Sequence, residues 1–261
     1  MGIHAVVTLL TSDIVYDPMN LIAYLPVSLC YIVSMACSFF GIRFIEESLA
    51  DPIENTAGAM CSLFCVIFLG ERIAPAIWGA IAIIVIGIIG VSYTERSAEV
   101  NRTQKLGKRL AIAAFAMPFC YAIIDALGSF LDIIFLEMET SPLIGVTEEN
   151  IELVANLSYE FTFAICAVIL FAFMKWKGVK FELPKQGDKI VAAVCETAGQ
   201  LTYVYAMSGN GAIAAPILSS VCVVSLLLSR IFLKEKLTKK QYVFIGIIIV
   251  GILMLAVLEG E

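Results

Sequence analysis

Three acidic residues, Asp125, Glu160 and Glu196, lie near the middle of long apolar runs. A carboxylate in a hydrocarbon environment is costly unless it meets a polar partner or takes up a proton. No Lys, Arg or His lies at the same depth in these runs. We therefore expect the three acids to bind protons or a cationic solute, because an ionised carboxylate attracts cations and a neutral one carries a proton.

Each acid belongs to a stripe of polar residues at helical spacing. The first stripe contains Tyr121 and Asp125. The second contains Asn156, Tyr159 and Glu160, and the third contains Glu196, Gln200 and Tyr203. Residues three or four positions apart share a helix face, so each stripe should face another helix or a water-filled cavity. The amides and phenols would then orient a solute by hydrogen bonds. Glu54 is a fourth, shallower candidate.

A structural role is the alternative for each acid, since a polar bond between membrane helices contributes only about 1 kcal/mol on average. Asp51 and Asp132 lie closer to the ends of their predicted helices. For these two acids we expect a structural or interfacial role.

The composition places the elements that carry these residues in a lipid bilayer. Sixty per cent of the 261 residues are hydrophobic, 15% are charged and the mean hydropathy is +0.93. Apolar runs of about 20 residues are long enough to cross the hydrocarbon as helices. The predicted spans are 20–44, 48–69, 73–94, 109–136, 150–174, 189–207, 212–233 and 240–258, with a shorter apolar stretch at 2–10. The predicted fold is an all-α, polytopic membrane helix bundle.

The chain also contains an internal repeat. Ala50-Asp51-Pro52-Ile53 recurs as Ala214-Ala215-Pro216-Ile217, shifted by 164 positions, and Gly87 falls on Gly251 at the same shift. We expect a first, incomplete repeat at 1–95, a basic linker at 96–108 and a second, complete five-helix repeat at 109–261. Either the first repeat evolved to be shorter, or the sequence is part of a longer chain that includes its first one and a half helices.

The repeated segments carry a family motif. Pro-Ile followed by Phe-Leu-x-Glu-Arg/Lys occurs from Pro52 to Arg72 and again from Pro216 to Lys236. This motif resembles that of EamA-type transporters of the drug/metabolite transporter superfamily. The resemblance implies two inverted five-helix repeats that move small solutes across a membrane.

Pro52 and Pro216 have two interpretations. A proline is tolerated in the first turn of a helix, where its missing N–H has little cost. Alternatively, each proline breaks a helix and frees backbone carbonyls at a cavity, as in the discontinuous helices of transporters.

The remaining features indicate orientation and exclude some chemistry. The basic segments 96–109, 175–189 and 230–240 should lie in the cytoplasm, because Lys-rich and Arg-rich loops stay on that side of a membrane. The eight cysteines all fall in apolar runs and should act as small hydrophobes, so no metal site or cofactor is expected. The one histidine, His4, lies in the short stretch at 2–10 and cannot anchor a catalytic set.

The sequence as a whole predicts a secondary transporter of the cell membrane. The predicted activity is proton-coupled export or exchange of small cationic or amphipathic metabolites or drugs by alternating access. The predicted partners are the lipid bilayer, a small solute and protons, with no nucleic acid. Two alternatives stay open: an intramembrane enzyme that uses paired acids, and a transporter subunit that needs a partner chain, for example in a homodimer.

Overall fold

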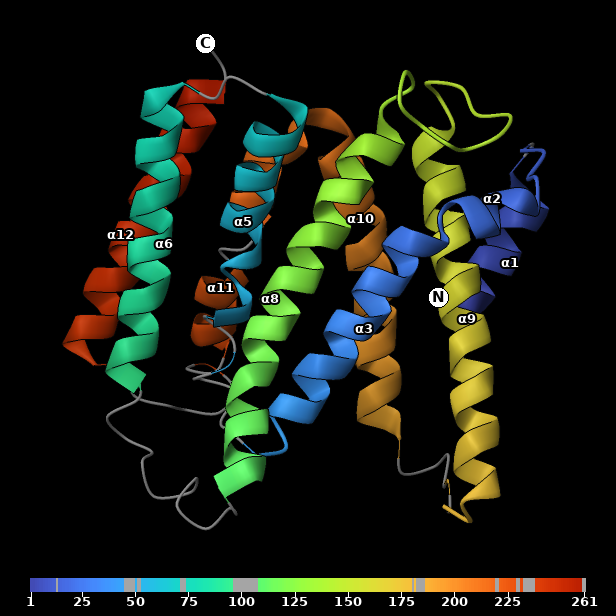
Figure 1. Ribbon diagram of the computed structural model, residues 1–261, viewed down its shortest axis with the longest axis horizontal. Coiled ribbons are helices and arrows are strands. Elements are labelled where there is room, and N and C mark those ends of the chain that lie inside the picture. Colours follow the sequence, from blue (N-terminus) through green and yellow to red (C-terminus); the bar gives the residue numbers. More distant parts are fainter. Residues whose placement is uncertain are drawn as a thin grey trace. The chain divides into compact units, whose positions relative to one another are not determined.

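The computed structural model describes residues 1–12, 14–44, 50, 53–70, 74–95, 108–179, 181, 186–218, 221–228, 231 and 238–259, and this part of the chain is all-helical (Figure 1). The elements are α1 (Gly2–Thr11), α2 (Met19–Ala23), α3 (Leu25–Gly41), α5 (Ala57–Phe64), the π-helical turn η1 (Cys65–Leu69), α6 (Pro75–Glu95), α8 (Lys108–Leu136), α9 (Ile151–Trp176), α10 (Gly187–Leu218), α11 (Val221–Leu228) and α12 (Lys239–Glu259). The predicted all-α bundle is confirmed.

Most predicted helices begin and end within a few residues of the observed bounds, and the differences occur at turns. The predicted helix at 20–44 is interrupted at Tyr24, which separates α2 from α3. A turn at Asn55 and Thr56 delays the regular helix α5. The loop predicted at 208–211 is instead a kink at Asn210 within α10, where φ is −114° and ψ is 77°.

Two helical segments in the described part of the chain are both long and apolar enough to cross a membrane, Ala116–Leu136 and Ile151–Trp176. Shorter apolar helices of 10–17 residues accompany them, namely Gly2–Thr11, Leu25–Gly41, Ala57–Leu69, Pro75–Gly90 and Tyr242–Met254. Two long apolar helices also occur in the cores of soluble proteins, so the membrane assignment needs family membership as well.

The internal repeat is visible in the bounds of the helices. Shifting α5 by 164 residues gives the bounds of α11, and shifting α6 by the same number gives those of α12. The repeat therefore extends beyond sequence motifs to the segments that are described as helical in both copies.

The pair α6 and α12 shows how the two copies pack, because the helices lie side by side (Figure 1). A Cβ added at Gly87 would lie 3.2 Å from the backbone nitrogen of Ile248, and one added at Gly251 would lie 3.2 Å from that of Ile84. Residues 84 and 87 become 248 and 251 at the shift of 164, so the same contact is made twice by antiparallel helices. Glycine permits this close approach, as small residues do between membrane helices.

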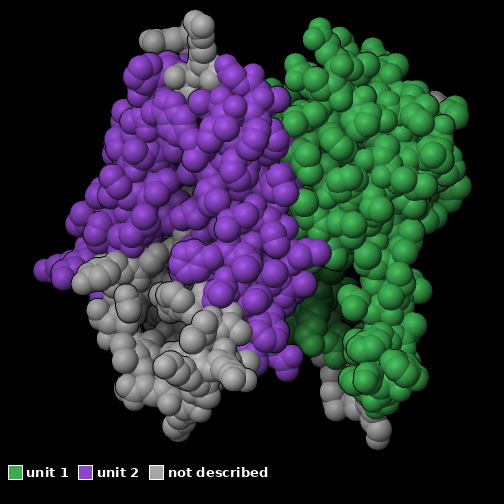
Figure 2. Space-filling view, viewed as in Figure 1, with its two compact units in different colours: residues 1–32, 131–209 green, residues 33–130, 210–261 purple. Residues whose placement is uncertain are grey.

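The structure divides into two compact units (Figure 2). Unit 1 comprises residues 1–32 and 131–209, and unit 2 comprises residues 33–130 and 210–261. The boundaries fall within α3, α8 and α10, so each unit combines segments that are distant in the sequence. The candidate functional residues are described unit by unit.

Candidate solute and proton sites

Unit 1 contains a pocket along α10 that holds one complete predicted stripe. The pocket has a volume of about 460 Å³. Its lining is Ala192, Cys195, Glu196, Gly199, Gln200 and Tyr203. The helical spacing therefore places Glu196, Gln200 and Tyr203 along one pocket. Glu196 is exposed, and its carboxylate has no hydrogen bond or ion pair with the described residues.

A hydrogen-bonded chain leads from this pocket into the interior of unit 1. The hydroxyl oxygens of Tyr203 and Tyr31 are 3.0 Å apart. Tyr31 donates to Oδ2 of Asp132 over 3.1 Å, and Tyr24 donates to Oδ1 of the same carboxylate. The chain thus connects a residue of the pocket to a buried acid.

Of the two roles expected for Asp132, structural or interfacial, the interfacial one is wrong, because its side chain is fully buried. Proximity to a helix end did not indicate exposure, since two phenols cover Asp132, Tyr24 from the turn between α2 and α3 and Tyr31 from α3. Neither tyrosine was among the predicted site residues. Their spacing of seven residues, two helical turns on one face, was the available signal.

Tyr159 packs against this chain of phenols. It is buried, and its ring meets that of Tyr31 edge to face with centroids 6.0 Å apart. Aromatic pairs in this geometry add stability beyond the area that they bury. Tyr159 therefore fixes the ring of Tyr31 between α9 and α10, where a second edge-to-face contact joins Tyr31 to Tyr203.

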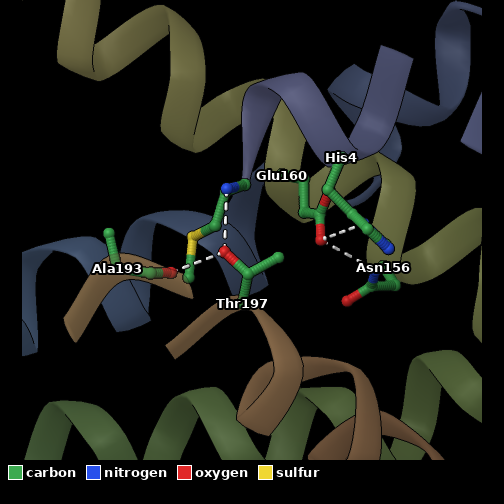
Figure 3. Close-up of polar contacts among 6 residues, drawn as sticks. His4, Asn156, Glu160, Ala193 and Thr197 are labelled. Atoms are coloured by element: carbon green, nitrogen blue, oxygen red, sulfur yellow. Dashed lines mark hydrogen bonds and ion pairs between the residues drawn. The ribbon is translucent and has the colours of Figure 1, made fainter. Parts of the chain in front are cut away.

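Glu160 lies in a separate polar cluster of unit 1 (Figure 3). Its side chain is fully buried, and Nδ1 of His4 lies 2.9 Å from Oε1 and 3.0 Å from Oε2. The amide nitrogen of Asn156 donates to Oε1 over 3.2 Å. The expectation that no basic side chain would face these acids is therefore wrong for Glu160, because α1 folds against α9 and brings His4 to it.

The same end of α1 also contacts α10. The amino nitrogen of Met1 donates to Oγ1 of Thr197 over 2.8 Å, and this hydroxyl donates to the carbonyl of Ala193 over 2.8 Å (Figure 3). Thr197 follows Glu196 directly in α10 but is buried. Thus His4 of α1 contacts α9 through its side chain, and Met1, just before α1, contacts α10 through its amino group.

The contact between His4 and Glu160 should stabilise the protein. Replacing His4 with Ala removes one hydrogen-bond donor from a buried carboxylate, and we expect the free energy of unfolding to fall by about 1 to 2 kcal/mol. The variant His4→Gln retains a donor and should recover part of this loss. Thermal unfolding of the purified protein in detergent micelles measures the difference. Equal stability of His4→Ala and the wild type would contradict a stabilising contact.

Unit 2 holds the other two predicted acids, and both are bonded to serines of α3. Ser34 donates to Oδ1 of Asp125 over 3.2 Å, and Tyr121 is a second hydrogen-bond partner of this carboxylate. Ser38 donates to Oε2 of Glu54 over 2.9 Å. Because the serines are one turn apart, α3 brings both acids to the same face of one helix.

Pro216 lies inside α10 and leaves one backbone carbonyl of the helix without its usual donor. A proline inside a helix has no N–H for the carbonyl four residues earlier, which here belongs to Ala212. The hydroxyl of Ser62 in α5 donates to this carbonyl instead. The freed carbonyl is therefore satisfied by the protein. Pro52 and Asp51 lie outside the described residues.

A double-mutant cycle tests this role of Ser62. The variant Ser62→Ala should lower the free energy of unfolding by about 1 to 2 kcal/mol, because a buried carbonyl loses its donor. In the background of Pro216→Ala the same change should cost little, since the new N–H of residue 216 can bond Ala212. Denaturant unfolding in detergent would give both values, and equal costs in the two backgrounds would show that Ser62 does not replace the missing N–H.

Comparison with known families finds one match, in the carboxyl-terminal half of the chain. The model of the EamA-like transporter family matches residues 140–257. The chain carries an EamA-like transporter segment. The predicted resemblance is thereby confirmed, and this family consists of multi-pass membrane transporters of small solutes rather than enzymes.

Comparison of folds finds solved structures that share the fold of almost the whole chain. Twenty-four chains of solved structures match it. One of them, described as "Crystal structure of protein", superposes with a TM-score of 0.60 and 14% sequence identity over 97% of this chain and 94% of its own. At this identity the likeness concerns the fold alone. No curated protein matches the chain significantly.

Proposed function

We propose that this EamA-like chain is a proton-coupled transporter of small cationic or amphipathic solutes, and that the pocket of α10 binds the solute. The observation that carries the proposal is the exposed carboxylate of Glu196 in a pocket that also presents Gln200 and Tyr203. A volume of about 460 Å³ is in the range of small-molecule sites.

The lining of the pocket favours a cation with an apolar body. The carboxylate attracts positive charge, the Gln200 amide can donate or accept a hydrogen bond, and the Tyr203 ring offers an aromatic face to a cation. Gly199 and Ala192 leave room beside these groups because their side chains are absent or small. Among the described residues no basic side chain lines the pocket, which disfavours phosphate-bearing solutes.

Proton coupling follows from the chemistry of one carboxylate. Glu196 can hold a cation when ionised or a proton when neutral, but it cannot hold both at once. Exposing this site alternately to each side of the membrane would exchange a solute cation for a proton. Asp125 and Glu160 are proposed as further proton sites, the first held by Ser34 and the second by His4.

The proposed location is the cell membrane, with the basic segments 96–109, 175–189 and 230–240 in the cytoplasm. Most of these segments lie outside the described residues. The positive-inside rule and the distribution of Lys and Arg support this orientation.

Transport by the purified full chain in proteoliposomes tests the proposal. Benzyltrimethylammonium is a suitable probe, because its permanent charge prevents passive permeation. Liposomes with an acidic interior should accumulate the probe, and a protonophore should abolish the accumulation. Uptake no faster than in protein-free liposomes would refute the proposed function.

The same preparation tests the alternative of a subunit that needs a partner. Reconstitution at high dilution yields liposomes with at most one chain. Uptake per chain that stays constant on dilution indicates a self-sufficient transporter. Total uptake that falls with the square of the protein concentration indicates that two chains must meet in one liposome to form a dimer.

A further inference from the structure

The carboxyl-terminal half of α9 is exposed on every face among the described residues. From residue 167 to residue 176 every side chain is exposed except that of Met174, and all but Lys175 are apolar. The contacts that α1 makes with α9 lie earlier in the helix, at Glu160 and Ala164. Ten consecutive residues cover all faces of a helix, and a helix that is apolar all round without a protein cover is suited to lipid.

Two lysines at the end of this apolar run lie over aromatic rings. Nζ of Lys175 is 5.6 Å from the centroid of the Phe171 ring. Nζ of Lys177 is 5.6 Å from the centroid of the Phe173 ring and 5.2 Å from that of the Trp176 ring. A cation at these distances is attracted to the face of the ring. The rings therefore keep both ammonium groups beside the end of α9, where neither forms an ion pair with a described carboxylate.

The turn that ends α9 closes this group of side chains. The N–H of Val179 donates to the carbonyl of Met174 over 3.0 Å, and Gly178 between them has a φ of 72°. This is a Schellman motif, which satisfies carbonyls at the end of a helix and turns the chain back. The ring of Phe181 then meets that of Phe171 edge to face, with centroids 5.6 Å apart. The resulting basic-aromatic patch consists of Phe171, Phe173, Lys175, Trp176, Lys177 and Phe181.

We propose that the basic-aromatic patch binds the headgroup of an anionic phospholipid, whose acyl chains lie along the exposed apolar half of α9. The two ammonium groups match the negative charge of the lipid phosphate. Trp176 is 79% exposed, and tryptophan prefers the headgroup level of a membrane because its ring is apolar and its N–H is polar. The inference goes beyond the proposed function and rests only on its membrane location.

The order of the residues along α9 favours a lipid over a soluble anion. The apolar run and the lysines follow one another on the same helix, as the acyl chains and the phosphate do in a phospholipid. A soluble phosphate would cover the lysines and leave the apolar run exposed. The segment 175–189 is proposed to lie in the cytoplasm, and the cytoplasmic leaflet is the one that carries anionic lipids. The charge and the apolar surface therefore fit the same molecule.

Quenching of tryptophan fluorescence by brominated lipids tests the inference, because bromine quenches only rings close to it. The chain has two tryptophans, and Trp78→Phe leaves Trp176 as the reporter of the patch. The purified full chain is reconstituted in phosphatidylcholine vesicles that contain equal fractions of either brominated phosphatidylglycerol or brominated phosphatidylcholine. The ratio of the two quenching curves gives the preference of the patch for the anionic lipid. The difference between the wild type and Trp176→Phe gives the same preference without a substitution at Trp78.

We expect the patch to bind the anionic lipid roughly fivefold more tightly than phosphatidylcholine, the contribution of one lysine close to an anionic surface. The double variant Lys175→Gln and Lys177→Gln should bring the two lipids close to equal binding. The control Lys239→Gln and Lys240→Gln removes the same charge from α12 and should retain the preference. Exchange of chloride for inorganic phosphate at equal ionic strength should not release the lipid.

Equal quenching by the two lipids in the wild type overturns the inference, and so does a preference that the double variant in α9 retains. Displacement of the lipid by inorganic phosphate also overturns it, because the lysines then bind a soluble anion. Absence of quenching by both lipids overturns the membrane location of this segment as well. Failure of the proposed function is a separate result, measured as solute uptake no faster than in protein-free liposomes.

Discussion

The variant Glu196→Gln should lose proton-driven uptake of benzyltrimethylammonium. Glutamine has nearly the same size as glutamate but carries no charge and takes up no proton at neutral pH. We expect the affinity for the cation to fall roughly tenfold or more, because a close charge partner is lost. The proton gradient should also stop driving the remaining transport, since Glu196 is the group that exchanges the cation for a proton.

The control for this variant is Glu139→Gln, which neutralises an exposed acid after the end of α8. It changes the net charge of the protein equally but should leave uptake unchanged. Parallel variants Asp125→Asn and Glu160→Gln test the other proposed proton sites. If gradient-driven uptake survives in the triple variant of Asp125, Glu160 and Glu196, proton coupling by these acids is ruled out.

Substituting alanine at Gly87 or Gly251 should destabilise the protein more than any other small change proposed for this chain. The added Cβ at either position lies within 3.2 Å of backbone atoms of the facing helix, and backbone cannot rotate away as a side chain can. The helices α6 and α12 must then separate. Overpacking of this kind lowers the free energy of unfolding by about 1 to 3 kcal/mol.

Each helix supplies its own control. Gly79 of α6 and Gly246 of α12 have no atom within 4 Å of an added Cβ. Alanine at these positions should leave stability unchanged or raise it by up to about 1 kcal/mol, through its higher helix propensity. Thermal unfolding in detergent compares the four variants. A loss at Gly87 no greater than that at Gly79 would mean that the helices do not meet there as described.

The equivalence of the two contacts makes a second comparison available. Gly87→Ala and Gly251→Ala should cost similar amounts, because each glycine faces the same kind of residue across the same helix pair. The double variant should cost less than the sum, since helices that one substitution has separated already accommodate the other.

The helices and the shared face of the α10 pocket residues could be predicted because their signals are local. Apolar runs define the helices, and spacings of three and four residues align Glu196, Gln200 and Tyr203 on one face of α10. The kink at Asn210 was predicted as a loop, because polar and glycine residues mark both features alike.

The polar partners of the buried acids could not be predicted, because they come from distant parts of the chain. His4 is separated from Glu160 by 156 residues, and Tyr24 from Asp132 by 108. Helical periodicity shows which residues share a face but not which helix that face meets. The short stretch that contains His4 therefore gave no sign that its histidine would contact a buried acid.

The reciprocal contact of Gly87 and Gly251 has a consequence for the symmetry of the chain. A contact in which residue i meets residue j, and the counterpart of j meets the counterpart of i, is isologous and is the kind that joins two identical subunits in a symmetric dimer. The antiparallel pair of α6 and α12 is such an interface held within a single polypeptide. Two copies of a single helix packed antiparallel about a two-fold axis would make the same contact.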